Sequence, residues 1–131
     1  MKVETAAYIQ KAKASREKAR VILAINVPDE AGRLAYLTAF HAAQALIYER
    51  TDREAKTHRG VRTQFALLTK DNAAVPDSVR EFLGQGYNLK TVADYGIDLS
   101  VVVPFDEAER SLAAADQFLA CVMSLLTDEA P

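Results

Sequence analysis

The sequence has a single cysteine, Cys121, among 131 residues. One thiol cannot form an internal disulfide, and no Cys and His residues stand at the spacings typical of metal sites, so we expect no metal or other cofactor. No apolar run approaches the roughly 18 residues of a membrane span. The start, Met1-Lys2-Val3-Glu4, lacks the apolar core of a signal peptide. We therefore expect a soluble protein of a reducing compartment, most simply the cytoplasm.

An excess of positive charge over the whole chain is also absent. Sixteen Lys and Arg residues stand against 18 Asp and Glu, which gives a formal net charge of -2 and a pI near 5.7. This balance argues against a nucleic-acid binder whose whole surface is basic, but not against a local basic site. Residues 49–62 hold five Lys or Arg against three Asp or Glu, whereas residues 102–131 hold one Arg against six Asp or Glu.

Glycine and proline are scarce, with five and four residues, and they cluster between segments where apolar residues recur every three or four positions. That pattern predicts helices. Val101-Val102-Val103 is the one strand-like run, and it is too short and isolated to imply a sheet. We expect one all-α domain over residues 1–131, an up-down bundle of four to five helices. The predicted helices cover residues 3–24, 29–50, 60–69, 78–92 and 106–126, the fourth being weakened by Gly84 and Gly86.

The predicted second helix is apolar nearly all round, which is typical of a helix buried by several neighbours. Its apolar faces exceed what one small bundle can cover, so we expect a second subunit to bury part of it in a twofold dimer. Within it, His41 is expected to be a hydrogen-bonded core or interface residue. Cys121 is expected to be a packed small hydrophobic residue. The predicted core contains Ile9, Leu34, Leu46, Phe65, Leu112 and Leu119.

Arg53 and His58, with four residues between them, are the residue types that phosphodiester chemistry needs. RNA carries its own nucleophile, the 2′-OH. Cleavage then needs a group that moves protons near neutral pH, which suits His, and a cation for the developing charge, which suits Arg. On an unbroken helix, residues five apart are separated by about 140° and do not share a face. The pair can converge only if the chain turns between them or if a second subunit completes the site.

Four further basic residues flank the pair, namely Arg50, Lys56, Arg59 and Arg62. They form either a rim that follows RNA phosphates or an ordinary solvated face. Glu54 can hold the pair in place or repel RNA. The simpler alternatives are a surface charge or an ion pair with Glu49 or Glu54 for Arg53, and a capping or solvent-facing role for His58.

The run Lys56-Thr57-His58-Arg59-Gly60-Val61 is followed by Phe65 and, after the fourth helix, by Ala93-Asp94-Tyr95. Together with the Arg-x4-His pair and the helix order, this pattern resembles the HEPN domain (higher eukaryotes and prokaryotes nucleotide-binding), in its small stand-alone prokaryotic branch, over nearly the whole chain. The resemblance implies a helical bundle that usually dimerises. Many members are metal-independent ribonucleases that use an Arg-x4–6-His motif. Others are toxins paired with a small nucleotidyltransferase antitoxin, and some only bind nucleotides or partners.

By this resemblance, Arg53 and His58 are the catalytic pair of a cleft made by two subunits. Glu54, Asp94 and Tyr95 are candidates for lining that cleft. The alternative for Asp94 and Tyr95 is that they fix the end of the fourth helix, with Tyr95 packed against it. The sequence departs from the family pattern after the Arg, where Glu54 stands in place of Asn, Asp or His. In members silenced by nucleotide transfer, a Tyr stands two residues after the His, and here that position is Gly60.

The sequence therefore predicts a metal-independent endoribonuclease or RNA-binding HEPN protein of a toxin–antitoxin or defence system, acting as a homodimer. The alternative is a non-catalytic HEPN protein that binds a nucleotide or a partner nucleotidyltransferase. A third interpretation is a plain helical interaction module.

Overall fold

The computed structural model describes residues 1–96 and 102–128. These residues form the helices α1 (Val3–Ala24), α2 (Pro28–Thr51), α3 (His58–Thr69), α4 (Asp77–Tyr95) and α5 (Phe105–Asp128). The described residues contain no strand, and the predicted all-α bundle is confirmed. Val102 and Val103 precede α5 as irregular chain, and Val101 lies outside the described residues.

Helix α3 begins at His58, two residues before the predicted start. The cause is Thr57, whose Oγ1 accepts the backbone N–H of Gly60 at 2.9 Å. A threonine in this N-cap position satisfies one of the free N–H groups in the first helical turn. His58 is thereby placed on the first turn of α3.

Helix α4 continues through both of its interior glycines to Tyr95. A Cβ added at Gly86 would lie 3.2 Å from the rings of Phe82 and Tyr36. The missing side chain therefore allows α4 to pack closely against α2. Packing offsets the low helix propensity of Gly84 and Gly86, which the sequence pattern alone could not reveal.

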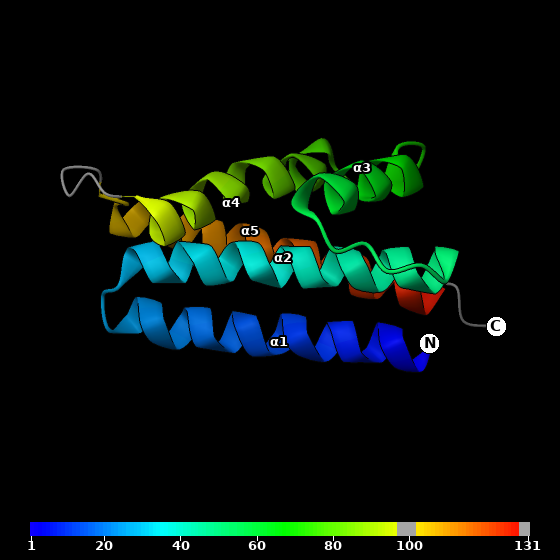
Figure 1. Ribbon diagram of the computed structural model, residues 1–131, viewed down its shortest axis with the longest axis horizontal. Helices are drawn as coiled ribbons and strands as arrows, with labels where there is room; N and C mark the ends of the chain where they lie inside the picture. The colour runs from blue at the N-terminus through cyan, green and yellow to red at the C-terminus, as the bar shows by residue number, and fades with distance from the viewer. Residues whose placement is uncertain (97–101, 129–131) are drawn as a thin grey trace.

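Consecutive long helices run in opposite directions, with α1 beside α2, α5 behind α2, and α3 and α4 following one another along the side of α2 away from α1 (Figure 1). Helix α2 contacts all four other helices. Its fully buried alanines, among them Ala35, Ala39 and Ala42, let neighbouring helices approach closely. The prediction that several neighbours bury this helix is confirmed.

The premise that one small bundle cannot cover the apolar faces of α2 is wrong. Four helices of the same chain cover it, and most of its apolar side chains are buried within the single protomer. The sequence pattern could not distinguish cover by short helices of the same chain from cover by another copy. A dimer therefore has to be argued from the site and not from the apolar surface of α2.

Five of the six predicted core residues are buried, namely Ile9, Leu34, Leu46, Phe65 and Leu119. Leu112 is half-buried and packs against a second, smaller cluster near the turn between α1 and α2. Cys121 is half-buried against the main cluster, as expected. Phe65 anchors α3 to the main cluster, because its ring stacks on Phe118 of α5 with centroids 4.8 Å apart.

We predict that Phe65→Ala lowers the free energy of unfolding by about 3–5 kcal/mol, since it leaves a cavity in the core. Leu67 of the same helix is 54% exposed. Leu67→Ala is the matched control and should change stability by no more than about 0.5 kcal/mol. Urea unfolding followed by circular dichroism measures both. Equal losses for the two variants would contradict the packing of α3 described here.

Candidate functional site

The turn between α2 and α3, residues 52–57, begins at a fixed point. Asp52 ends α2 with a φ of 60°, in the left-handed conformation that closes many helices. The Lys2 ammonium lies 2.7 Å from the Asp52 carboxylate and donates to the Glu49 carbonyl at 2.6 Å. The start of α1 therefore holds the end of α2 directly before Arg53.

The middle of the turn is held from inside the bundle by Gln44. The Gln44 amide nitrogen donates to the Ala55 carbonyl at 2.8 Å, and its amide oxygen lies 2.8 Å from His41 Nδ1. Since that oxygen can only accept, His41 Nδ1 carries a hydrogen. Burial lowers the pKa of His41, so the ring is neutral at pH 7. His41 thus has the hydrogen-bonded interior role that was expected.

Arg53 lies on the exposed side of this turn. Its backbone N–H donates to Thr51 Oγ1 at 3.1 Å, whereas no described residue pairs with its guanidinium. The side chain lines a hollow of about 370 Å³. The other residues that line it are Ile47, Thr51, Glu54, Ala55 and Gln64.

His58 is half-buried and is held by two aromatic residues. Its Nδ1 lies 2.7 Å from the Tyr36 hydroxyl. Its ring stacks on Tyr87 with centroids 3.8 Å apart and planes 15° apart. Burial lowers the pKa of His58, and the Arg62 charge lowers it further, so the ring is predominantly neutral at pH 7. A neutral imidazole near its titration range is suited to proton transfer.

His58 lines a second hollow, of about 640 Å³, along the outer face of α3. The other residues that line it are Arg59, Arg62, Thr63, Ala66 and Leu67. Arg53 is absent from this lining, and His58 is absent from the lining of the first hollow. The chain does turn between the two residues, as their spacing required, but within one protomer they open into different hollows.

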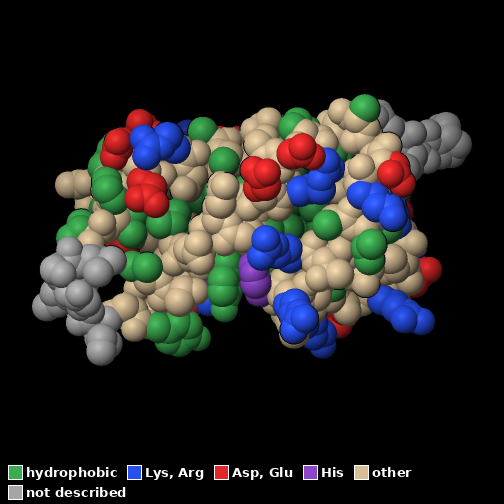
Figure 2. All heavy atoms as spheres, turned by 90° about the horizontal axis from the view of Figure 1, so that it is seen from above, with side chains coloured by type: hydrophobic (Ala, Val, Ile, Leu, Met, Phe, Trp, Pro, Cys, Tyr) green, Lys and Arg blue, Asp and Glu red, His purple; other side chains and the backbone are tan. Residues whose placement is uncertain are grey.

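Three arginines have guanidinium groups with no hydrogen-bond or ion-pair partner in the part of the chain that the structure describes, namely Arg53, Arg59 and Arg62. All three lie within ten residues of sequence around His58. The arginines elsewhere form the ion pairs Arg16–Asp116, Arg20–Glu17, Arg33–Asp94, Arg80–Asp77 and Arg110–Asp106. Figure 2 shows a histidine with Lys and Arg side chains on either side of it, while acidic side chains gather elsewhere on that face.

The other flanking residues are engaged. The Arg50 guanidinium donates to the Leu68 carbonyl at 3.3 Å, which joins α2 to α3. Lys56 pairs with Glu54 at 3.2 Å. Burial of Tyr8 raises the pKa of its hydroxyl, and the nearby Glu54 carboxylate raises it further. Among the described residues, the alternative that Arg53 pairs with Glu49 or Glu54 is wrong.

Asp94 and Tyr95 line neither hollow. The Asp94 carboxylate accepts from Arg33 at 2.9 Å and also pairs with Lys90, which ties the end of α4 to α2. The Lys90 and Arg33 hydrogen bonds lower the pKa of Asp94. Tyr95 is 71% exposed, with the Lys90 ammonium over its ring. Asp94 thus fixes the end of α4 as expected, whereas the expectation that Tyr95 packs there is wrong, because its side chain is exposed.

Sequence reasoning missed Tyr36, Tyr87 and Gln44. Tyr36 and Gln44 carry polar atoms inside a helix predicted to be buried on all sides, and buried polar atoms need partners. That was a usable signal, although it could not identify the partners. Tyr87 offered no comparable signal, because its role depends on how α4 packs against α2.

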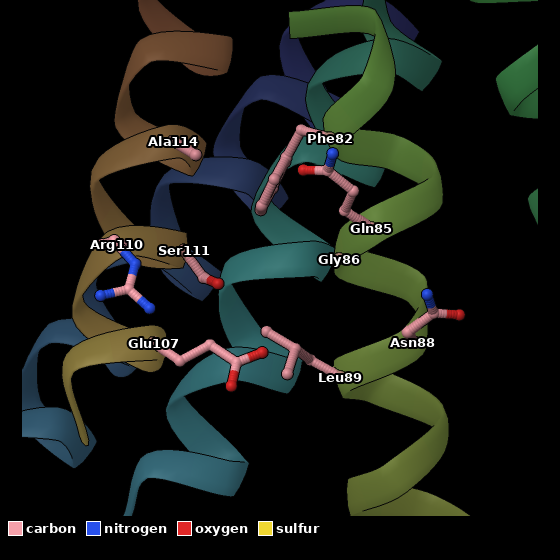
Figure 3. Close-up of a pocket in the computed structure, with 9 residues that line it drawn as sticks. All are labelled: Phe82, Gln85, Gly86, Asn88, Leu89, Glu107, Arg110, Ser111 and Ala114. Carbon is pink, nitrogen blue, oxygen red and sulfur yellow. The ribbon is translucent and has the colours of Figure 1, made fainter. Parts of the chain in front are cut away.

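A third hollow, of about 510 Å³, lies between α4 and α5 (Figure 3). Phe82 and Leu89 point into it from α4, and Glu107, Arg110 and Ser111 line it from α5. It contains no residue of the Arg–His region. Within the described residues, no three His, Cys, Asp or Glu side chains come together as metal ligands, and no helix is long and apolar enough to cross a membrane.

Known proteins resemble this chain over most of its length. A protein of Methanocaldococcus jannaschii with the name "Putative toxin MJ0605" is 27% identical over 116 residues, which cover 88% of this chain and 84% of that protein. The model of the HEPN domain family matches residues 5–125, from the first turn of α1 to the last turns of α5. This match includes the turn at residues 52–57, the hollows lined by Arg53 and by His58, and the three arginines Arg53, Arg59 and Arg62. The chain belongs to the HEPN domain family.

Proposed function

We propose that this protein is a metal-independent endoribonuclease of a toxin–antitoxin or defence system. The observation that carries the proposal is the set of three guanidinium groups, those of Arg53, Arg59 and Arg62, that have no partner among residues 1–96 and 102–128 and lie around a half-buried neutral histidine. The arginines elsewhere have partners, so among the described residues the guanidinium groups free to bind a phosphate lie around His58. Membership of the HEPN family and likeness to a protein named as a putative toxin support the same activity. We expect it to act in the cytoplasm, where RNA is available.

The proposed step is intramolecular transfer within RNA. The 2′ oxygen attacks phosphorus, its proton passes to His58, and the bond from phosphorus to the 5′ oxygen breaks. The 5′ oxygen takes a proton from water, the hydroxide left behind takes the proton from His58, and the product keeps a 2′,3′-cyclic phosphate. Arg53 stabilises the extra negative charge on the phosphorane oxygens.

We further propose that two copies form the complete site. In one protomer Arg53 and His58 open into separate hollows, and three contacts pin the turn between them: Lys2 with Asp52, Gln44 with Ala55, and the Thr57 cap. A twofold axis next to the turn would place Arg53 of one copy against His58 of the other. Such a site needs no rearrangement of either turn.

We predict that His58→Ala and Arg53→Ala each abolish cleavage of single-stranded RNA. Loss of general acid–base help costs about 10²–10⁴-fold, and loss of a charge stabiliser costs about 10²–10³-fold. Arg20→Ala is the control, because Arg20 pairs with Glu17 on the exposed surface of α1. EDTA should leave the cleavage rate unchanged, because the proposed step uses no metal. DNA should not be cleaved, because it lacks the 2′-OH. Gel-based cleavage assays measure all of these.

If the His58→Ala protein cleaves RNA at the same rate as the wild type, the proposed chemistry is refuted. If the wild type cleaves no RNA tested, the alternative becomes the better one, namely a non-catalytic HEPN protein that binds a nucleotide or a nucleotidyltransferase. A rise in Tm with added nucleotide would then identify the nucleotide-binding form.

Mixing the two inactive variants tests the shared site. If Arg53 of one copy works with His58 of the other, a mixed dimer of Arg53→Ala and His58→Ala has one intact site and one site that lacks both groups. We predict that mixing restores activity toward half of the wild-type rate per mixed dimer. No recovery, although native mass spectrometry shows that mixed dimers form, would mean that each chain uses its own pair. A monomer at micromolar concentration would exclude the shared site.

The unpaired arginines on the outer face of α3 should govern RNA affinity. We predict that Arg59→Gln and Arg62→Gln each weaken binding and reduce the slope of log K against log salt by about 0.7, the value for one phosphate contact on a single strand. Arg110→Gln is the matched control, since Arg110 pairs with Asp106 beside a different hollow. Fluorescence anisotropy at several salt concentrations measures the slopes, and equal slopes for all variants would contradict an RNA rim on α3.

A further inference from the structure

We propose that Tyr36 is a positioning residue for His58, whose hydroxyl engages Nδ1 and leaves Nε2 as the nitrogen that exchanges a proton with the substrate. The inference rests on the proposed proton-transfer role of His58. It adds a residue 22 positions earlier in the sequence, on a different helix, and it specifies which ring nitrogen reacts.

Tyr36 is a rigid point of attachment. It is 1% exposed, and its ring contacts those of Phe40 and Tyr87, each with centroids 5.8 Å away. At Gly86 there is no side chain, and an added Cβ would lie 3.2 Å from Tyr36 Cδ1. Helix α4 therefore presses on the ring directly, and so close a packing leaves it little freedom to change rotamer. The hydroxyl is fixed in space by the core of the protein.

Two contacts then determine the orientation of His58. The 2.7 Å bond from the Tyr36 hydroxyl fixes the position of Nδ1. The stack on Tyr87, with planes 15° apart, fixes the plane of the imidazole. With Nδ1 engaged, Nε2 is the remaining ring nitrogen, and none of the hydrogen bonds among the described residues uses it. The nitrogen that meets a phosphodiester in the hollow of His58 is therefore Nε2.

The Tyr36 hydroxyl can keep this bond through a proton-transfer cycle. A phenol donates to the Nδ1 lone pair or accepts from Nδ1–H. Before His58 accepts the 2′-OH proton on Nε2, its own hydrogen must be on Nδ1, with the Tyr36 oxygen as acceptor. Once the ring is charged, that bond is charge-assisted and about twice as strong as a neutral one. Tyr36 thus favours the charged ring against burial and the Arg62 charge, which both oppose it.

The test is an NMR titration of His58 in Tyr36→Phe, with no RNA present. Removing the acceptor should lower the pH at which His58 titrates by about half a pH unit, the difference between a charged and a neutral hydrogen bond. Tyr87→Phe is the matched control, because it also removes one hydroxyl from a ring against His58, but that hydroxyl makes no bond to it. Tyr87→Phe should titrate like the wild type. A wild-type titration in Tyr36→Phe would overturn the proposal.

A second measurement does not depend on the variant. In the wild type, ¹⁵N spectra should show that His58 Nδ1 is hydrogen-bonded, and free exchange of both ring nitrogens with solvent would contradict the role of Tyr36. If the protein cleaves RNA, Tyr36→Phe should lower kcat more than it raises KM and should move the acidic limb of the pH–rate profile to lower pH. The titration stands even if no RNA is cleaved, so failure of this inference and failure of the nuclease proposal give different results.

Discussion

The site depends on the burial of α2 by the four other helices. Tyr36 and Gln44 sit in that buried helix, and each must find a partner for a polar group that water cannot reach. Gln44 finds the Ala55 carbonyl in the turn, and Tyr36 finds His58 at the start of α3. Two interactions that satisfy buried polar groups of α2 therefore also fix the Arg–His region. The positions of Ala55 and His58 are therefore set by side chains of the buried helix α2 and not by the exposed turn itself.

The distribution of positive charge also favours the Arg–His region as the site that binds an anion. The chain carries a net charge of -2, yet the guanidinium groups without partners among the described residues are all in this region. The other arginines are engaged by carboxylate or carbonyl oxygens, so among the described residues the guanidinium groups left to bind a phosphate lie around His58. Burial lowers the pKa of His58 and the Arg62 charge lowers it further, so both favour the neutral ring. An anion bound beside Arg62 would reduce that effect and make the ring easier to protonate.

The helices and most of the core could be predicted from the sequence, because apolar spacing reports directly on which face of a helix is buried. Phe65 and Leu119 are buried as predicted, and α3 differs at its start only because the Thr57 cap was not weighed. The partners of the site residues could not be predicted. Tyr36 and Tyr87 lie 22 and 29 positions from His58, and their contacts exist only once α2, α3 and α4 have packed. The spacing of apolar residues also cannot show whether the apolar faces of α2 are buried by other helices of the same chain or by a second copy of the protein.

The pinned turn bears on how Arg53 and His58 come to act together. If the turn itself moved to carry Arg53 into the hollow of His58 within one chain, it would leave Gln44, and a buried amide that loses its partner costs about 1–3 kcal/mol. The ion pair between Lys2 and Asp52 would be lost as well. A second copy, as proposed above, would supply its own Arg53 with its turn intact, so the cost would be limited to that of association. The contacts that hold each turn open thus favour a site shared by two chains over one that closes within a single chain.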